Sequence, residues 1–118
     1  WLNIRKRRMV KKYIPDRGDI IWLSLEPQAG REIQKRRPAC VISPKVYNKK
    51  IGLCLCMPIT SQIKQYPFEF MLNSKEVSGV ILCDQIRSLD FIARDAKLIT
   101  ALSDKEVAGV IALFKTLI

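Results

Sequence analysis

Residues 103–106 read Ser-Asp-Lys-Glu, and they precede five apolar residues at helical spacing: Val107, Val110, Ile111, Phe114 and Leu117. A serine three residues before a glutamate is typical of a capping box, in which the serine oxygen accepts a free backbone N–H and the glutamate reaches back. The spacing predicts a helix whose apolar face packs inward. This stretch therefore predicts a helix at the end of whatever fold the upstream residues form.

Upstream of this helix, short runs of apolar and β-branched residues alternate with turn-forming residues. Such runs are typical of strands. We expect strands over residues 20–25, 38–43, 51–57, 68–72, 79–83 and 97–101, while residues 86–91 are ambiguous. Residues 26–37, 44–50 and 58–65 are expected to be connections. Several short strands followed by one helix predict a small, strongly bent antiparallel sheet or barrel.

The composition excludes several classes of protein. The chain has 118 residues, which predicts one domain, and its apolar runs are too short for a membrane-spanning helix. It has 21 Lys and Arg against 11 Asp and Glu, and no histidine. Catalysis by a Ser-His-Asp triad, a Cys-His dyad or a pair of histidines within one chain is therefore excluded.

The positive charge is concentrated near the first residue. Residues 1–12 hold six basic residues and no acidic one. A basic arm favours polyanions, and it is equally typical of a solvated tail. Because Met9 is a plausible start, we expect residues 1–8 to be a basic extension and residues 9–118 to form the single domain.

The four cysteines, Cys40, Cys54, Cys56 and Cys83, each lie in an apolar stretch. This placement is typical of small buried hydrophobic residues. Cys54 and Cys56 alternate along an expected strand and should share one face. We expect no metal site, and free buried thiols favour a reducing cytoplasm.

Without histidine, arginine, carboxylate and hydroxyl side chains remain for chemistry. Arg37 lies directly before Pro38, which restricts its backbone to extended conformations at the rim of the sheet. Its planar, permanently charged guanidinium suits a phosphate, and the Thr60 hydroxyl, in a similar position after a strand, can donate to a phosphate oxygen. Spacing alone does not make these residues an active site.

Several motifs follow one another in a characteristic order: residues 13–22 (YIPDRGDIIW), 27–32 (PxxGxE), 37–44 (RPACVISP), 47–48 (YN), 54–60 (CLCMPIT), 66–69 (YPFE), 79–80 (GV) and 84–88 (DQIRS). This series resembles the MazF/PemK family of bacterial toxins, which are mRNA interferases of toxin–antitoxin systems, and it is most similar to the enterobacterial branch. The resemblance covers residues 9–118 without a gap.

The resemblance implies an SH3-like β-barrel with a C-terminal helix, working as a symmetric homodimer. It implies cutting of single-stranded mRNA at a short sequence without a metal or other cofactor, and neutralisation by an acidic antitoxin. Arg37 and Thr60 match the catalytic pair of the family. Glu32 matches an acidic residue important for activity, and Gln85 matches a residue near the RNA path.

Further RNA contacts are expected from Lys64, Arg87 and Arg36 to phosphates, and from the Tyr66 ring to a base. The loop between Glu32 and Arg37 departs from the family pattern because Ile-Gln-Lys-Arg stands where the family often has glutamine and glycine. This loop is therefore expected to be stiffer and more basic.

We expect the 2′-hydroxyl of the RNA to attack the adjoining phosphate, with Arg37 and Thr60 stabilising the charge that develops. Two alternatives stay open at this point. One is a CcdB-type gyrase poison that acts by binding a protein, and the other is a non-catalytic nucleic-acid-binding barrel. All three would work in the cytoplasm, away from a membrane.

Overall fold

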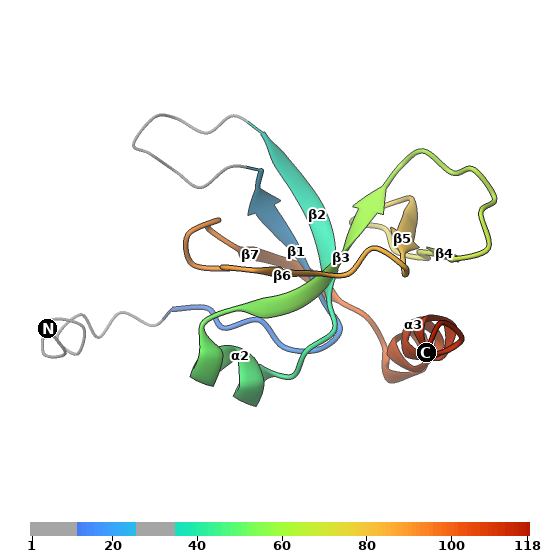
Figure 1. The fold of residues 1–118 in the computed structure, drawn as a ribbon. Coiled ribbons are helices and arrows are strands. Elements are labelled where there is room, and N and C mark those ends of the chain that lie inside the picture. The colour runs from blue at the N-terminus through green and yellow to red at the C-terminus, as the bar shows by residue number, and fades with distance from the viewer. Residues whose placement is uncertain (1–11, 26–34) are drawn as a thin grey trace, which may run out of the picture.

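The computed structural model describes residues 12–25 and 35–118. Seven strands and two helices follow one another in this part of the chain (Figure 1). They are β1 (Asp19–Ser24), β2 (Arg36–Val41), α2 (Lys45–Ile51), β3 (Cys54–Thr60), β4 (Glu69–Met71), β5 (Val80–Leu82), β6 (Arg87–Leu89), β7 (Lys97–Ala101) and α3 (Asp104–Lys115).

The strands form one antiparallel sheet with the order β4-β5-β3-β2-β1-β7, and β6 pairs with β3 outside this path. The strand β3 runs through the centre: its first half pairs with β2 and β6, and Ile59 and Thr60 pair with β5. Among the described residues, β4 and β7 do not pair with each other, so the sheet is not closed. The expected bent antiparallel sheet with a C-terminal helix is confirmed, and closure into a barrel is not.

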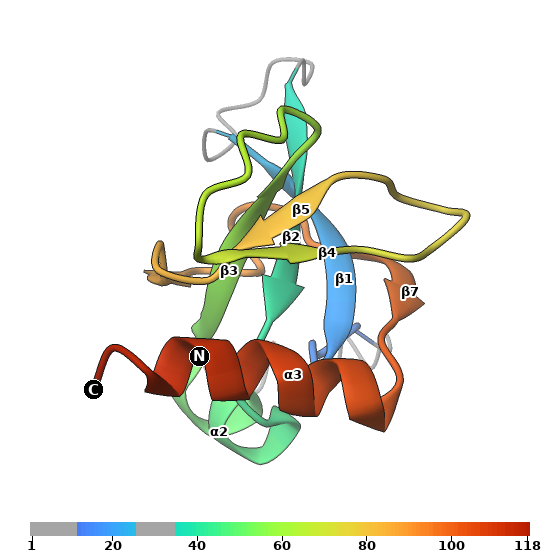
Figure 2. The same cartoon turned by 90° about the vertical axis from the view of Figure 1, so that its right-hand side faces the viewer.

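Two apolar clusters lie on the two faces of the sheet. Ile20, Cys40 and Met57 belong to the cluster that α3 covers, and the alternate residues Ile21 and Val41 belong to the other cluster. Figure 2 shows α3 lying across the sheet. Because both faces are covered, strands such as β1 carry nearly continuous apolar runs rather than a strict alternation.

The capping box at the start of α3 is confirmed. The Glu106 N–H donates to Ser103 Oγ at 3.1 Å, and the Ser103 N–H donates to the Glu106 carboxylate at 2.9 Å. The expected inward face is right for Val110, which is buried, and wrong for Leu117, which is 45% exposed beyond the end of the helix. Leu113 packs against the core instead.

The connection expected over residues 44–50 is wrong, because residues Lys45–Ile51 form the helix α2. Its start carries no side-chain cap, and it ends at Gly52, whose φ of 83° lies in the left-handed region that favours glycine. The helix is held by the wholly buried Asn48, which donates to the carbonyl of Pro15 at 2.8 Å. The following strand consequently begins at Cys54, three residues later than expected.

The connection expected over residues 58–65 is wrong at its start, because β3 continues to Thr60. The other boundaries differ less. β7 matches its expected range, and the ambiguous residues 86–91 contain β6. β2 begins at Arg36, inside the expected loop 26–37, most of which lies outside the described residues, as does the extension 1–8. In the described part of the chain, no helix is long and apolar enough to span a bilayer.

Candidate active site

A cavity of about 540 Å³ opens where the ends of β1, β2 and β3 meet the β4–β5 connection. Its size lies within the range of ordinary small-molecule sites. The residues that line it are Trp22, Arg37, Pro38, Ile59, Thr60, Ser61, Gln62, Glu76, Val77 and Ser78. The cavity therefore contains both members of the predicted catalytic pair.

Strand register explains why Arg37 and Thr60 come together. The last recorded pairs between β2 and β3 are Cys40 with Met57 and Ala39 with Pro58. Two residues further along each strand, the same register places Arg37 opposite Thr60. Side chains at facing positions of an antiparallel pair lie on the same side and are neighbours. The pair thus follows from the sheet rather than from a flexible loop.

Residues of the neighbouring row of the sheet also line the cavity. Trp22 faces Pro38 across β1 and β2, and the register of β2 and β3 places Ile59 beyond Pro38. Trp22 is 36% exposed and lines the same cavity as Arg37. A cavity that contains both an aromatic residue and a guanidinium is suited to a nucleobase next to a phosphate.

The Thr60 hydroxyl is oriented by its own backbone. The Gln62 N–H donates to Thr60 Oγ1 at 3.1 Å, so one lone pair of the hydroxyl oxygen is occupied. Within the part of the chain that the structure describes, no acceptor is recorded for the hydroxyl hydrogen, which can be donated to a bound molecule. This arrangement suits a donor to a phosphate oxygen, as the sequence predicted.

The β4–β5 connection forms another wall of the cavity and is fixed at both ends. The Leu72 N–H donates to the Gly79 carbonyl at 3.0 Å, and Val77 is buried in the core. Between these anchors, Ser74 Oγ donates to the Glu76 carboxylate at 2.9 Å and accepts the Glu76 N–H at 3.1 Å. Glu76 is therefore held at the cavity by a defined turn.

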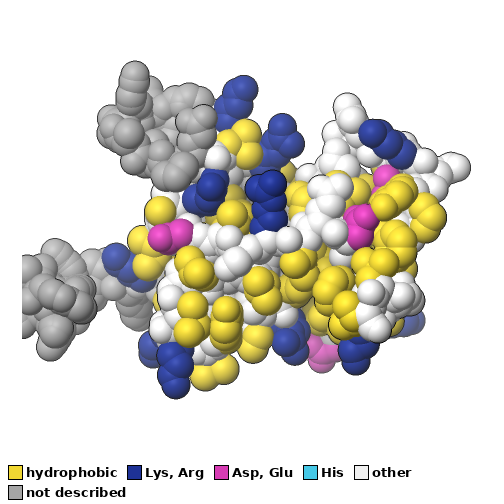
Figure 3. Space-filling view, viewed as in Figure 1, with side chains coloured by type: hydrophobic (Ala, Val, Ile, Leu, Met, Phe, Trp, Pro, Cys, Tyr) yellow, Lys and Arg dark blue, Asp and Glu magenta, His cyan; other side chains and the backbone are white. Residues whose placement is uncertain are grey.

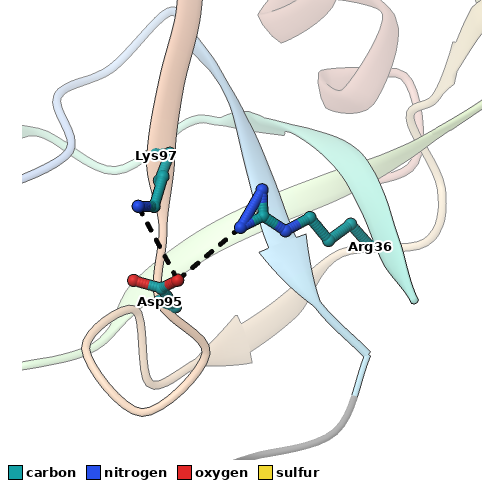
Figure 4. Close-up of polar contacts among 3 residues, drawn as sticks. All are labelled: Arg36, Asp95 and Lys97. Atoms are coloured by element: carbon teal, nitrogen blue, oxygen red, sulfur yellow. Dashed lines mark ion pairs between the residues drawn. The ribbon is translucent and has the colours of Figure 1, made fainter. Parts of the chain in front are cut away.

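Arg36 is oriented differently from its neighbour Arg37. Its guanidinium lies 3.6 Å from the Asp95 carboxylate, which Lys97 approaches to 3.9 Å (Figure 4). Consecutive residues of a strand point to opposite faces, which is why the two arginines separate. All three side chains are more than a third exposed, so the cluster contributes little to stability.

The other predicted RNA contacts do not line the cavity. Lys64 and Tyr66 lie in the connection after β3, where the Lys64 N–H donates to Glu69 and the Tyr66 hydroxyl donates to Asp84 at 2.5 Å. This hydrogen bond raises the pKa of the Tyr66 hydroxyl. Gln85 is exposed in the turn after β5, where its N–H donates to the Leu82 carbonyl at 3.1 Å.

Arg87 is exposed on β6, opposite Cys56, near the far end of β3 from Thr60. Glu32, the expected acidic residue of the site, lies outside the described residues. Of the lining residues, sequence reasoning proposed only Arg37 and Thr60 as site residues, and it missed the aromatic Trp22 and the acidic Glu76 among others. Trp22 could have been found, because it is the large aromatic residue in the apolar run of β1. Glu76 could not, because it lies in a polar stretch whose sequence resembles an ordinary turn.

Basic side chains gather around this end of the sheet. Figure 3 shows Lys and Arg over the region where β1 ends and β2 begins, with few acidic side chains beside them on the face in view. A positive surface of this kind favours a polyanion and speeds its association. The site therefore combines a donor pair, an aromatic surface and an attractive field for a nucleic acid.

The cysteines do not take part in this site. All four are free and buried, and Cys54 and Cys56 share one apolar cluster, as expected. Burial raises the pKa of the Cys40 thiol to about 12 and that of Cys83 to about 11. Such thiols are protonated at neutral pH and act as small apolar side chains.

Comparisons with known proteins agree with this site. A family model described as PemK-like, MazF-like toxin of type II toxin-antitoxin system matches residues 16–118. The endoribonuclease toxin MazF of Escherichia coli is 50% identical over 88 residues, which are 75% of this chain and 79% of that protein. The endoribonuclease toxin ChpB of the same species is 39% identical over 105 residues, 84% of this chain and 90% of that protein.

A crystal structure of MazE–MazF from Deinococcus radiodurans superimposes with a TM-score of 0.80 at 38% identity, covering 90% of this chain and 96% of that one. The fold, the cavity and these matches define an endoribonuclease toxin. The chain belongs to the PemK-like, MazF-like toxins of type II toxin–antitoxin systems. Among the three functions considered from the sequence, the endoribonuclease, the gyrase poison and the non-catalytic binding barrel, the matches favour the endoribonuclease.

Proposed function

We propose that this endoribonuclease cuts single-stranded mRNA at a short sequence by attack of the RNA's own 2′-hydroxyl. One observation carries this proposal: the register of β2 and β3 brings Arg37 and Thr60, two phosphate-binding donors, into one cavity. The substrate supplies the nucleophile, so the reaction needs no metal-activated water. It also requires the 2′-hydroxyl that DNA lacks.

In the proposed step, a bond forms between the 2′-oxygen and the phosphorus, and the bond from phosphorus to the 5′-oxygen breaks. The departing 5′-oxygen takes up a proton from the Arg37 guanidinium or from a water. The products are a 2′,3′-cyclic phosphate, or the 3′-phosphate after its hydrolysis, and a 5′-hydroxyl. Negative charge develops on the nonbridging oxygens. Arg37 and the free hydrogen of the Thr60 hydroxyl donate to these oxygens, and each such donor is worth about 2.7–4 kcal/mol in comparable oxyanion sites.

The proton of the 2′-hydroxyl needs an acceptor. Arginine is unsuited to this role because its pKa exceeds about 12. We assign the role to Glu32 or to a water that Glu32 orients. Glu32 belongs to the first loop and is close in sequence to Arg37. The Arg37 guanidinium acts as the charge clamp rather than as the base.

The family also suggests partners and a setting for this chain. We propose that an acidic antitoxin covers the basic surface around β1 and β2, as a partner with complementary charge would. We further propose that two copies of the chain form a symmetric homodimer. In each copy, we propose that the bent sheet is the SH3-like barrel of the family. The four free, buried thiols favour work in the reducing cytoplasm.

The test uses one oligonucleotide made of DNA with a single ribonucleotide on the 5′ side of a mapped cut. We expect the purified protein to cut it in EDTA and to leave a cyclic phosphate and a 5′-hydroxyl. The same oligonucleotide with a 2′-methoxy group at that position is the matched control and should stay intact. Cutting of the control, or 5′-phosphate ends, would overturn the proposed mechanism.

A further inference from the structure

Glu76 is a carboxylate that lines the cavity of Arg37 and Thr60. Within residues 12–25 and 35–118, the recorded ion pairs involve Asp95 alone among the acidic residues, with Arg36 and Lys97. The Glu76 carboxylate thus forms no ion pair there, and its recorded hydrogen-bond partner is Ser74, which donates to Oε1. Glu76 is exposed, and among the described residues no partner is recorded for its second oxygen, Oε2, which can accept from a bound molecule.

A negative charge beside a phosphate site repels the phosphate and weakens binding. The same charge becomes favourable when it faces a hydrogen-bond donor of the substrate. In RNA, the donors within reach of a phosphate-binding site are the ribose 2′-hydroxyl and the groups on the edges of the bases. The proposed cleavage already assigns the 2′-hydroxyl proton to Glu32 or to a water, so a base edge is left for the Glu76 carboxylate.

The Ser74 hydroxyl holds one oxygen of the Glu76 carboxylate in place. The turn around Ser74 and the burial of Val77 also fix where the Glu76 side chain begins. A fixed acceptor can discriminate between bases, because its partner must meet it at one position.

We propose that the cavity holds the nucleobase adjoining the scissile phosphate, stacked on Trp22, and that Glu76 selects a base with an exocyclic amino group. This inference rests on the proposed cleavage at Arg37 and Thr60. Cytosine carries an amino donor at C4, where uracil carries a carbonyl acceptor, and adenine carries an amino donor at C6. Uracil would place its carbonyl oxygen against the carboxylate, and the two acceptors would repel each other.

The experiment compares RNAs that differ by cytosine against uracil, or by adenosine against purine riboside, at each position flanking the mapped cut. For the unmodified protein, we expect kcat/KM at one flanking position to favour the amino base by about fivefold to 100-fold, the range for a good base contact. In Glu76→Gln, whose amide can donate as well as accept, this preference should fall to within about twofold, while the preferences at other positions persist.

The control is Asp104→Asn, the same chemical change in the first turn of α3, away from the cavity. It should keep every base preference. The inference is overturned if the unmodified protein shows no preference for an amino base at any flanking position, or if Glu76→Gln keeps the preference. An equal loss of cleavage on all RNAs in Glu76→Gln also overturns it, because a base-reading residue would not act uniformly.

Arg37→Ala separates this inference from the cleavage mechanism on which it rests. If Arg37→Ala abolishes cutting and Glu76→Gln leaves the preferences intact, only the reading role of Glu76 fails. If Arg37→Ala cuts like the unmodified protein, the cavity is not the cleavage site and both fail.

Discussion

Gly79 lies against the backbone of Thr60 so closely that a β-carbon at Gly79 would overlap the Thr60 carbonyl and come within 3.1 Å of Ser61 Cα. Its φ of 124° is a conformation that residues with side chains rarely adopt. The β4–β5 connection can therefore pack on the end of β3 because residue 79 has no side chain. This contact sets one wall of the cavity at a fixed distance from Thr60.

Gly79→Ala should accordingly damage both stability and cleavage. We expect a loss of several kcal/mol in the free energy of unfolding, because about 1–3 kcal/mol of backbone strain adds to the clash. Urea denaturation and initial cleavage rates would measure the two effects. Gly52→Ala is the matched control, since its φ of 83° is also positive but nothing lies within 4 Å of the added carbon. Equal losses in both variants would show that the contact with Thr60 is unimportant.

Arg37→Ala and Thr60→Ala should each reduce kcat by at least about 100-fold, by comparison with the removal of one donor from an oxyanion site. The reason is that both donors act on charge that develops in the transition state. Arg36→Ala should instead raise KM, because Arg36 is turned toward Asp95 and can serve only as a binding contact. Single-turnover kinetics on one RNA separate these effects. A kcat loss in Arg36→Ala as large as that in Arg37→Ala would contradict the assignment.

Lys64→Ala and Arg87→Ala should each weaken RNA binding and lower the slope of log Kd against log salt concentration by about 0.7, the value for one phosphate contact to a single strand. Fluorescence titrations with a non-cleavable RNA between low and physiological salt would give the slope. Lys105→Ala, an exposed change of equal charge on α3, should keep the original slope. An unchanged slope in both site variants would exclude the two residues from the RNA path.

Asn48→Ala should destabilise the fold by about 2–4 kcal/mol, since three hydrogen bonds at about 0.5–1.5 kcal/mol each are lost in a buried site. The side chain donates to Pro15 and Ser43 carbonyls at 2.8 and 3.0 Å and accepts from Ser43 Oγ at 2.6 Å. Thermal denaturation would report the change. The exposed neighbour Lys49→Ala should alter stability by less than about 0.5 kcal/mol. A similar cost for both would mean that the network contributes nothing.

Stability should fall at alkaline pH because of the buried thiols. In the folded state the pKa values of Cys83 and Cys40 are raised by burial to about 11 and about 12, from an ordinary value of 9.0. A raised folded pKa gives stability that is fully present below pH 9 and is lost as the pH rises toward 11 or 12. Within that window, the ionisation of each thiol lowers the free energy of unfolding by about 1.4 kcal/mol per pH unit.

Urea denaturation between pH 8 and pH 10.5 would measure this loss. Cys83→Ala should start from a lower stability and show a shallower fall with pH, because one of the titrating thiols has been removed. Parallel curves for the variant and the unmodified protein would exclude Cys83 as a source of the pH dependence.

Local signals predicted much of the fold. The capping box at Ser103 and the short apolar runs identified α3 and most strands, because hydrogen bonding and burial act there over few residues. The helix α2 was missed because Pro44 provides no side-chain cap and the helix depends on a long-range bond from Asn48 to Pro15. A contact between residues so distant in sequence leaves no local pattern.

The site shows the same division. Arg37 and Thr60 could be named from their motifs, but their meeting depends on strand register, which the sequence does not state. Glu76 could not be found, because its position results from the packing of the β4–β5 connection on Thr60. The local sequence around a polar residue between two strands does not predict that the residue will line a cavity.

The central position of β2 and β3 in the sheet has a consequence for how the enzyme loses activity. Each of these strands is paired on both sides, so fraying at the edge strands β4 and β7 leaves Arg37 and Thr60 in register. Amide exchange at Cys40 and Met57 should require opening of the whole domain rather than a local fluctuation. Inactivation by heat or denaturant should then coincide with global unfolding.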